Sequence, residues 1–387
     1  MVKRRVCILT GTRAEWGLLS PIAAALKARE DVELQIVATN MHLDPRYGHT
    51  VDQIEAAGLR VNERVKMATD NPTGAAAARA MGQCISGMAD ALERLQPDLA
   101  VILGDRYEML AAASACTVMR IPIAHLHGGE LTIGAMDDAI RHAITKMAAL
   151  HLTSTETHRQ RVIQMGEQPD MVINTGAIGV YNTLNIPRVS REELESDLGI
   201  EVDNRTLLVT YHPATMDQRP ATDLFDNLLE AIDRHPDSKV IFTYPNNDPS
   251  GAGLIEMIER YAAANPQRVR AVASLGARRY LSLLPLIGAA VGNSSSGLIE
   301  VPSAGIPTVN IGIRQQGRTS APSVIDCGDT ADEISAAIDR ALSGEMRTIA
   351  SRRENPYYQP DTLKLIVEAI AETPTERLRN KQFFDIK

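Results

Sequence analysis

The sequence predicts an α/β protein with two Rossmann-like halves, each a parallel sheet with helices on both faces. Short β-branched runs alternate with helical patterns along almost the whole chain, which is typical of doubly wound sheets. The 387 residues are too many for one ordinary domain and suit two. The pattern weakens at 176–199, where Pro187 and a capping Ser190 occur, and we expect the linker there.

The first half contains strands and helices in alternation. Its strands are expected at 6–10, 34–38, 99–103, 121–125, 150–154 and 171–174. Its helices are expected at 18–28, 50–57, 75–95, 108–118, 137–147 and 156–165.

The second half repeats this rhythm. Its strands are expected at 207–211, 240–244, 269–273, 289–292, 308–311 and 323–325. Its helices are expected at 223–234, 254–264, 278–284, 297–304 and 331–341, and a last helix at 362–371.

Composition disfavours two classes of partner. Aromatic residues make up only 4% of the chain and the net charge is -8, so no nucleic acid is expected to bind. No apolar run is long enough to span a bilayer, and the start reads as a strand, so neither a membrane nor a signal peptide is expected. The four cysteines lack metal-ligand spacing, and we expect them to be reduced and buried in the core. Reduced cysteines indicate a cytoplasmic protein.

Ligands of open α/β sheets bind beyond the carboxyl ends of the strands, and loops from two facing domains would share a cleft. In GTRAEWG (11–17), Arg13 follows the first strand and either binds a phosphate at a helix start or forms an ordinary surface pair. In GDRYE (104–108), Asp105 directly follows a strand and is either a functional carboxylate or the cap of the next helix.

The segment HLHGGELTIGAMDDAIRHAITK (125–146) combines an apolar helix face with a charge cluster. The cluster is either a solvated surface or half of an active site, and comprises Asp137, Asp138, Arg141 and His142. A metal site is a weaker alternative, because no fixed spacing completes the set His125, His127, Asp105 and Asp137.

Three motifs of the second half lie after predicted strands. His212 in YHPAT is suited to proton transfer, although a lone histidine is more often structural. In GNSSSGLIE (292–300), Ser294–Ser296 suit a diphosphate and Glu300 a ribose diol, unless a serine merely caps the helix. Arg314 and Arg318 in IRQQGR would supply phosphate-binding charge.

These motifs, in this order, resemble those of the hydrolysing UDP-N-acetylglucosamine 2-epimerase family over almost the whole chain. The resemblance implies the GT-B fold, with domains at 1–180 and 181–365 and a helix at 366–387 that returns to the first domain. It implies conversion of a UDP-linked 2-acetamido sugar to the free C2 epimer and UDP, for sialic-type acid synthesis, with no cofactor and no obligatory metal. A homo-oligomer, dimer or tetramer, is expected.

Site residues follow from the same match. Asp105 and Asp137 correspond to catalytic carboxylates and His212 to a histidine near the leaving phosphate, while His127 or Glu130 would supply a proton. The residues expected to bind substrate or nucleotide are Arg13, Arg106, Arg141, Asn293, Ser294, Ser295, Ser296, Glu300, Arg314 and Arg318. Asp138 and His142 are expected to form only a pair four residues apart on the helix.

One departure bears on the substrate. Many members that act on UDP-N-acetylglucosamine have Glu where this chain has His127, and the His form resembles the subgroup that handles 2,4-diacetamido-2,4,6-trideoxy sugars for legionaminic acid. MHLDPRYG (41–48) points the same way. NPYYQP also lacks the glycine that often follows NPY in the family. A non-hydrolysing epimerase, a GT-B glycosyltransferase and a catalytically inactive nucleotide-sugar-binding regulator are the alternatives.

Overall fold

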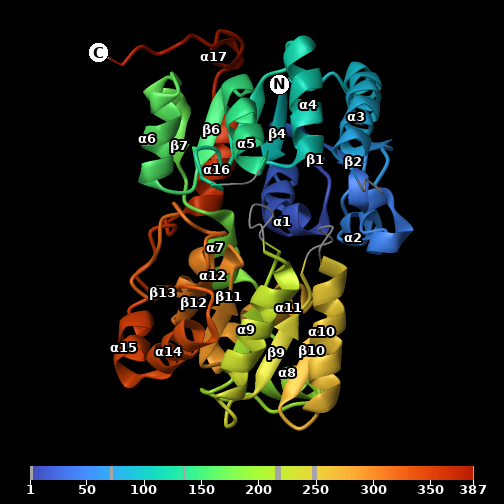
Figure 1. Cartoon of the computed structure of the whole chain (residues 1–387). Helices are drawn as coiled ribbons and strands as arrows, with labels where there is room; N and C mark the ends of the chain where they lie inside the picture. The colour runs from blue at the N-terminus through green and yellow to red at the C-terminus, as the bar shows by residue number, and fades with distance from the viewer. Residues whose placement is uncertain (1–2, 70–72, 134–135, 214–218, 246–250, 387) are drawn as a thin grey trace. The chain divides into compact units, whose positions relative to one another are not determined.

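The computed structural model describes residues 3–69, 73–133, 136–213, 219–245 and 251–386. The chain divides into two compact units (Figure 1). The first comprises Met1–Glu130, Met136–Ile178 and Tyr358–Lys387, and the second comprises Leu131–Ala135 and Gly179–Tyr357. Each unit is a parallel sheet with interleaved helices, so the predicted fold class is confirmed.

The first unit is built on a seven-stranded parallel sheet with the order β3-β2-β1-β4-β5-β6-β7. Its strands are β1 (Arg4–Thr10), β2 (Val32–Thr39), β3 (Glu63–Val65), β4 (Leu99–Leu103), β5 (Ile123–Leu126), β6 (Leu150–Thr153) and β7 (Val172–Asn174). The strand order reverses between the neighbours β1 and β4. Ligands of such sheets bind at this switch point, beyond the carboxyl ends of the strands.

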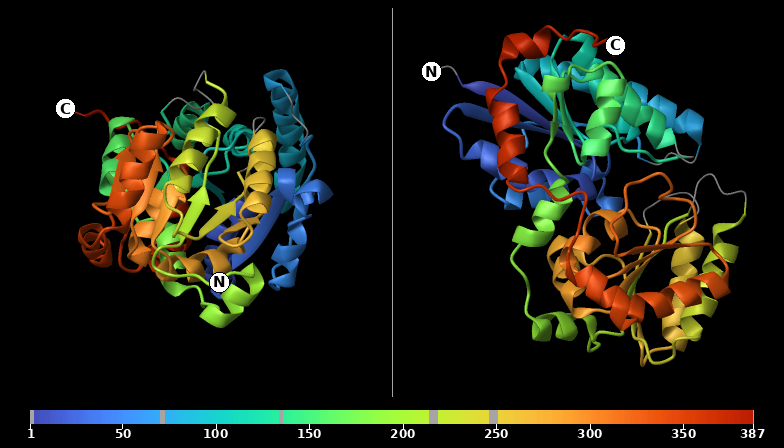
Figure 2. Two further views of the ribbon diagram at one scale, coloured as in Figure 1. Left: turned by 60° about the horizontal axis from the view of Figure 1, so that its bottom comes forward. Right: turned by 90° about the vertical axis from the view of Figure 1, so that its left-hand side faces the viewer.

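Helices cover both faces of this sheet. They are α1 (Arg13–Lys27), α2 (Val51–Ala56), α3 (Gly74–Leu95), α4 (Tyr107–Val118), α5 (Met136–Met147), α6 (Glu156–Gln164), α16 (Thr362–Glu372) and α17 (Thr375–Arg379). Cys7 and Leu9 of β1 share a buried cluster with Met88 of α3 and Met109 of α4. Because side chains alternate along a strand, Ile8 faces the other side. The C-terminal α16 packs against α1 and β1, as the right-hand view of Figure 2 shows.

The second unit repeats the plan with a six-stranded parallel sheet in the order β10-β9-β8-β11-β12-β13. Its strands are β8 (Leu207–Thr210), β9 (Val240–Thr243), β10 (Val269–Val272), β11 (Ala289–Gly292), β12 (Thr308–Ile311) and β13 (Val324–Cys327). Leu207 and Val209 pack with Phe225 on one face, whereas Leu208 packs with Leu284 on the other. The switch point lies between β8 and β11.

This part of the chain also contains nine described helices, of which α7 begins at the last residue of the first unit before the second. They are α7 (Ile178–Asn185), α8 (Arg191–Leu198), α9 (Ala221–Asp233), α10 (Gly251–Ala264), α11 (Gly276–Leu283), α12 (Ser296–Ile299), α13 (Val301–Ala304), α14 (Ala331–Leu342) and α15 (Gly344–Ser351). Short 3-10 turns occur at Asn40–Leu43, Pro45–Tyr47, Pro169–Met171 and Leu284–Leu286. None of the described helices is both long enough and apolar enough to span a membrane.

Several predicted boundaries were wrong. Helix α1 begins at Arg13 and not at residue 18, because Thr12 and Glu15 form a capping box. The segment 176–199 contains α7 and α8, although Ser190 does cap α8 as expected. The helix predicted at 297–304 is two short helices, with Pro302 in the first turn of the second, where its missing N–H cannot continue a helix. The edge strand β3 and helices α15 and α17 were missed.

Candidate active site

A tight turn at the β1–β4 switch point is held by a buried carboxylate. Thr12 Oγ1 accepts a hydrogen bond from the Glu15 amide at 3.3 Å. Glu15 Oε2 in turn accepts from the amides of Gly11 and Thr12, at 2.8 and 3.2 Å. A Cβ on Gly11 would lie 2.7 Å from Glu108 Oε1, so a larger residue there would require the Glu108 side chain to move.

Two acidic side chains therefore lie side by side beneath this turn. Arg106 Nε donates to Glu108 Oε1 at 2.6 Å and lies 3.9 Å from Glu15 Oε1. Burial, with Glu108 nearby, raises the pKa of Glu15 to about 7. Arg106, expected to bind substrate, is thus engaged by carboxylates of its own chain, whereas Arg13 is exposed at the first position of α1.

Arg141 joins two candidate carboxylates. It is buried on α5, and its Nη2 donates to Oδ2 of Asp105, which directly follows β4. Its Nη1 lies 4.0 Å from Oε2 of Glu130, which follows β5. Asp105 is not the cap of α4, because the N-cap is Arg106 and no side chain caps that end. The capping alternative for Asp105 is therefore wrong.

The charge cluster on α5 divides into two faces. Asp137 lies in the first turn, four residues before Arg141 and so on the same face of the helix. Asp138 and His142 form the expected pair, with 3.5 Å between Oδ2 and Nε2. Burial lowers the pKa of His142. The face with Asp137 is thus the one that carries the guanidinium bound to Asp105.

Glu130 is the centre of a buried hydrogen-bond network. Its Oε1 lies 2.8 Å from His127 Nδ1 and accepts from Ser154 Oγ at 2.7 Å. Ser154 Oγ is in turn 2.9 Å from His158 Nδ1. His127 has a left-handed backbone with φ 63°, which is uncommon for a residue other than glycine.

The two histidines of HLHGGE differ in their surroundings. His125 is wholly buried on β5, with Nε2 2.8 Å from the Gly104 carbonyl oxygen and Nδ1 3.2 Å from Thr145 Oγ1. Burial lowers the pKa of His125 to about 3. Within the described part of the chain, no group of three or more His, Cys, Asp or Glu side chains is arranged to hold a metal ion.

In the second unit, Asn293 ties the loop after β8 to the loop after β11. Its Oδ1 accepts from the His212 amide at 2.7 Å and its Nδ2 donates to the His212 carbonyl oxygen at 2.8 Å. Burial, followed by the charge of Arg314, lowers the pKa of His212 to about 3. The imidazole is therefore neutral at neutral pH. Residues 214 and 215 of the YHPAT motif lie outside the described residues.

The serine turn after β11 requires a glycine at its start. Gly292 has φ 135°, and a Cβ there would lie only 2.0 Å from the Thr210 carbonyl oxygen. Ser295 is the N-cap of α12, yet neither it nor another side chain makes a cap hydrogen bond there. Ser296 Oγ instead lies 2.7 Å from the Tyr280 hydroxyl, and Glu300 follows between α12 and α13.

The two arginines of IRQQGR have different partners. Arg314 Nη1 donates to the Asn293 carbonyl oxygen at 2.9 Å, so it lies at the serine turn. Arg318 donates to the Leu131 carbonyl oxygen at 3.2 Å and to Thr132 Oγ1 at 3.3 Å, which directs it to the segment that follows Glu130 in the chain.

Sequence comparison assigns the family. The family model described as UDP-N-acetylglucosamine 2-epimerase matches residues 24–371. The chain belongs to this family. It is 37% identical to the Campylobacter jejuni "GDP/UDP-N,N'-diacetylbacillosamine 2-epimerase (hydrolyzing)", over 90% of each chain. It is 34% identical to the Legionella pneumophila UDP-N,N'-diacetylbacillosamine 2-epimerase (hydrolyzing), over 88% of this chain and 89% of that one.

Solved structures of the epimerase family share the fold. The UDP-GlcNAc 2-epimerase from Neisseria meningitidis bound to UDP-GlcNAc aligns with a TM-score of 0.81 and 18% identity, over 95% of this chain and 100% of that chain. A structure from Listeria monocytogenes aligns with a TM-score of 0.79 over 100% of both. The activity implied by the sequence motifs agrees with the names of the hydrolysing relatives.

In this epimerase fold, the predicted residues gather in two groups. The first unit brings together Asp105, Arg141, Glu130 and His127, and the second brings together His212, Asn293 and Arg314. Sequence reasoning missed the buried residues that support these groups, namely Glu15, Glu108, Ser154, His158 and Tyr280. A capping pattern at Thr12–Glu15 was one available signal, and Glu108 ends the GDRYE motif, whereas Ser154, His158 and Tyr280 lie in segments without a motif of their own.

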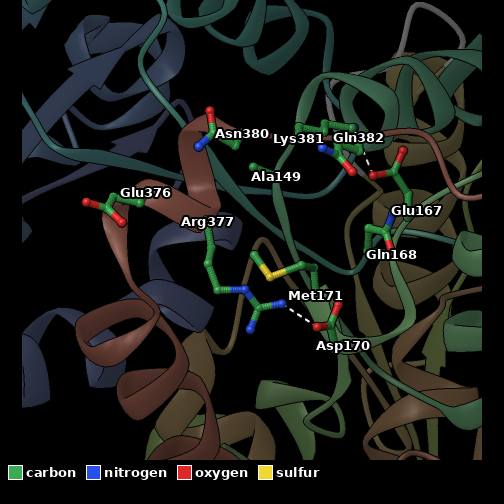
Figure 3. Close-up of a pocket in the computed structure, with 10 residues that line it drawn as sticks. All are labelled: Ala149, Glu167, Gln168, Asp170, Met171, Glu376, Arg377, Asn380, Lys381 and Gln382. Carbon is green, nitrogen blue, oxygen red and sulfur yellow. Dashed lines mark hydrogen bonds and ion pairs between the residues drawn. The ribbon is translucent and has the colours of Figure 1, made fainter.

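One cavity of the first unit is lined by residues that do not belong to the β1–β4 switch point. It has a volume of about 400 Å³ and is lined by residues of α17 and the C-terminal tail on one side and by residues near 167–171 on the other (Figure 3). Arg377 pairs with Asp170 across it. Lys381 lies 2.9 Å from the buried Glu167, which also pairs with Lys146 and His151. These pairs attach the C-terminal tail to its own unit.

Proposed function

We propose that this protein is a hydrolysing 2-epimerase of a UDP-linked 2-acetamido sugar, which releases the free C2-epimeric sugar and UDP. The observation that carries the proposal is the cluster of Asp105, Arg141, Glu130 and His127 beyond β4 and β5. It combines carboxylates, a guanidinium and an imidazole that can stabilise a cation and move a proton. The names of the hydrolysing relatives support the same activity.

The chemistry explains why such a cluster is needed. The C2 hydrogen of the sugar is not acidic, because C1 carries no carbonyl group. Breaking the bond between C1 and the phosphate oxygen first leaves an oxocarbenium-like centre that acidifies C2, and Asp105 and Asp137 would stabilise it. Loss of the C2 proton gives a glycal. Water then adds at C1 while a proton returns to C2 from the opposite face, which inverts C2.

We expect residues of the second unit to bind the diphosphate of the substrate. Arg314, the amides and hydroxyls of Ser294–Ser296, and His212 would bind it, with Glu300 on the ribose. Because the His212 imidazole is neutral at neutral pH, it would donate one N–H to a phosphate oxygen and not act as a cation. Bound diphosphate would raise the pKa of His212, since a nearby negative charge favours the protonated ring.

The substrate we favour is UDP-2,4-diacetamido-2,4,6-trideoxyglucose. The relatives named for UDP-N,N'-diacetylbacillosamine are 37% and 34% identical to this chain, and His127 replaces the glutamate of many UDP-N-acetylglucosamine enzymes. The product would feed nonulosonic acid synthesis in the cytoplasm. A 33% identical relative from Escherichia coli is named polysialic acid biosynthesis protein P7, which fits that type of product.

Incubation with each UDP-sugar in deuterated water, without an acceptor, tests the proposal. We expect UDP and a free sugar that is inverted and deuterated at C2, formed faster from the diacetamido substrate than from UDP-N-acetylglucosamine. A UDP-linked epimer would identify a non-hydrolysing epimerase. An absolute need for an acceptor would identify a glycosyltransferase. Free sugar without deuterium at C2 would rule out elimination.

A further inference from the structure

The loop that follows β6 contains two buried polar side chains that belong to no recognised motif. Ser154 directly follows the strand and is wholly buried, and His158 lies in the first turn of α6 with 1% exposure. Thr155, between them, is the N-cap of α6 and accepts a hydrogen bond from the His158 amide at 3.2 Å. Buried polar groups are costly unless they are bonded, so the partners of this pair are informative.

The number of hydrogens on each group decides which atom donates and which accepts in the hydrogen bonds among Glu130, Ser154 and His158. The serine hydroxyl has one hydrogen, which it donates to Oε1 of Glu130 at 2.7 Å. Ser154 Oγ must therefore accept from His158 Nδ1, at 2.9 Å, which assigns the proton of the His158 ring to that nitrogen. The same Oε1 accepts from His127 Nδ1 at 2.8 Å.

In this network, Nε2 is the ring nitrogen of His127 that can exchange a proton with a substrate. When the His127 ring carries a single proton, on Nδ1 facing Glu130, its lone pair lies on Nε2, which has no hydrogen-bond partner among the described residues. The other carboxylate oxygen of Glu130, Oε2, lies 4.0 Å from Nη1 of the Arg141 guanidinium, which adds an ion pair. A carboxylate held in this way orients an imidazole, as the buried aspartate does in serine proteases.

The backbone adds a second contact between α6 and the loop. Gly129 has φ 80°, and a Cβ there would lie 2.5 Å from the His158 carbonyl oxygen. The turn that contains His127 and Glu130 thus rests directly on the first turn of α6. His158 consequently supports this turn through its carbonyl group as well as through Ser154.

We propose that Ser154 and His158 are positioning residues that hold Glu130 against His127 Nδ1, so that His127 Nε2 is the group that exchanges the proton at C2. The inference rests on the proposed epimerase function. It also chooses between His127 and Glu130, a choice that the sequence leaves open. Ser154 itself touches no reacting atom in this scheme.

The test compares Ser154→Ala with Ser154→Thr, which keeps the hydroxyl, and with the control Ser238→Ala, which removes another wholly buried serine hydroxyl. We expect S154A to lower kcat about 10- to 100-fold with KM changed less than about 3-fold, as for other supporting hydrogen bonds of a site. S154T should restore most of kcat, and S238A should retain it. Equal kcat values for S154A and S238A would overturn the proposal.

A second readout does not depend on turnover. Imidazole nitrogen shifts of labelled histidine, with the His127 signals assigned through His127→Gln, report which ring nitrogen carries the proton. We expect the Nδ1–H form of His127 in the wild type and in S238A, and a loss of that form in S154A. An unchanged His127 spectrum in S154A would contradict the inference even if the enzyme is active. A wild type that shows the expected spectrum but converts no UDP-sugar would overturn the proposed function alone.

Discussion

At the scale of single residues, Asn293 has both ends of its carboxamide occupied by the backbone of His212. The oxygen accepts at 2.7 Å and the nitrogen donates at 2.8 Å, and the residue is 1% exposed. Arg314 and Gln315 both donate to the carbonyl oxygen of Asn293. Asn293 was predicted to bind nucleotide, but its side chain is better suited to hold His212 in place.

Asn293→Asp should therefore weaken both folding and UDP binding. It replaces the N–H donor that faces the His212 carbonyl oxygen by an acceptor and adds a buried charge, at an expected cost of about 2 to 4 kcal/mol in the free energy of unfolding. Urea unfolding and calorimetric titration with UDP measure the two effects. Asn185→Asp, at an exposed site, is the control. Equal behaviour of the two variants would contradict this role.

Glu15 should make stability depend on pH. Its pKa is raised to about 7 in the folded protein, so folding favours the protonated form. The stabilisation is fully present below about pH 4.3, which is the usual pKa of a glutamate in an unfolded chain. It is lost as the pH rises through the folded pKa of Glu15. Between pH 5 and 8, Glu15→Gln should gain on the order of 1 to 3 kcal/mol relative to the wild type in urea unfolding. Exposed Glu156→Gln should show no such trend.

Single residues show what sequence reasoning can and cannot supply. Motifs led to the predictions for Asp105, His212 and Arg314, because strand ends and residue types are local properties of the chain. They did not identify the partners, since a hydrogen bond such as that from Ser154 to Glu130 joins residues 24 positions apart. Arg318 is another example: its hydrogen bonds to the Leu131 carbonyl oxygen and to Thr132 Oγ1 join residues more than 180 positions apart.

At the scale of elements, some glycines are required by the backbone around them and others could be replaced by alanine. Gly292→Ala should cost on the order of 3 kcal/mol or more and abolish UDP binding, because its Cβ would overlap the Thr210 carbonyl oxygen. Gly82, within α3, has open space around a Cβ, and Gly82→Ala should stabilise the protein by about 0.5 to 1 kcal/mol. Thermal unfolding distinguishes them. A tolerated Gly292→Ala would show that the loop after β11 can shift.

Strands were easier to predict than helix ends. Buried parallel strands are apolar runs bounded by turn residues, so β1, β4 and β8 were found close to their observed positions. The strand β3 is only three residues long and contains two charged residues, so no periodicity marks it. Helix α8 was missed because its moderate apolar pattern follows Pro187 and resembles a linker.

At the scale of the whole molecule, the C-terminal segment belongs to the first unit. Arg4 of β1 donates to the carbonyl oxygens of Ile370, Ala371 and Thr373 and to Thr375 Oγ1. Lys381 donates to the carbonyl oxygens of Lys146 and Ala148 and pairs with Glu167. Helix α16 was predicted from its sequence, whereas its packing partner α1 is more than 300 residues away and no local pattern reveals it.

Lys381→Met should destabilise the first unit selectively. It leaves two carbonyl groups and the buried Glu167 without the ammonium, at an expected cost of about 2 to 4 kcal/mol. Hydrogen exchange should then increase in β6, β7 and α17 and not in β8–β13. Exposed Lys364→Met, whose pair with Glu368 spans 4.0 Å, should change stability by less than about 0.5 kcal/mol. Increased exchange in both sheets would mean that the units unfold together.

The discontinuous first unit also has a consequence for biosynthesis. The strands of both sheets are translated before α16, which packs against β1 and supplies carbonyl oxygens to Arg4. The second unit consists of Gly179–Tyr357 and of the five residues Leu131–Ala135, which lie within the sequence of the first unit. It can fold while the polypeptide is still growing. The first unit, by contrast, becomes complete only after residues 358–387 have been translated, so its assembly follows that of the second unit.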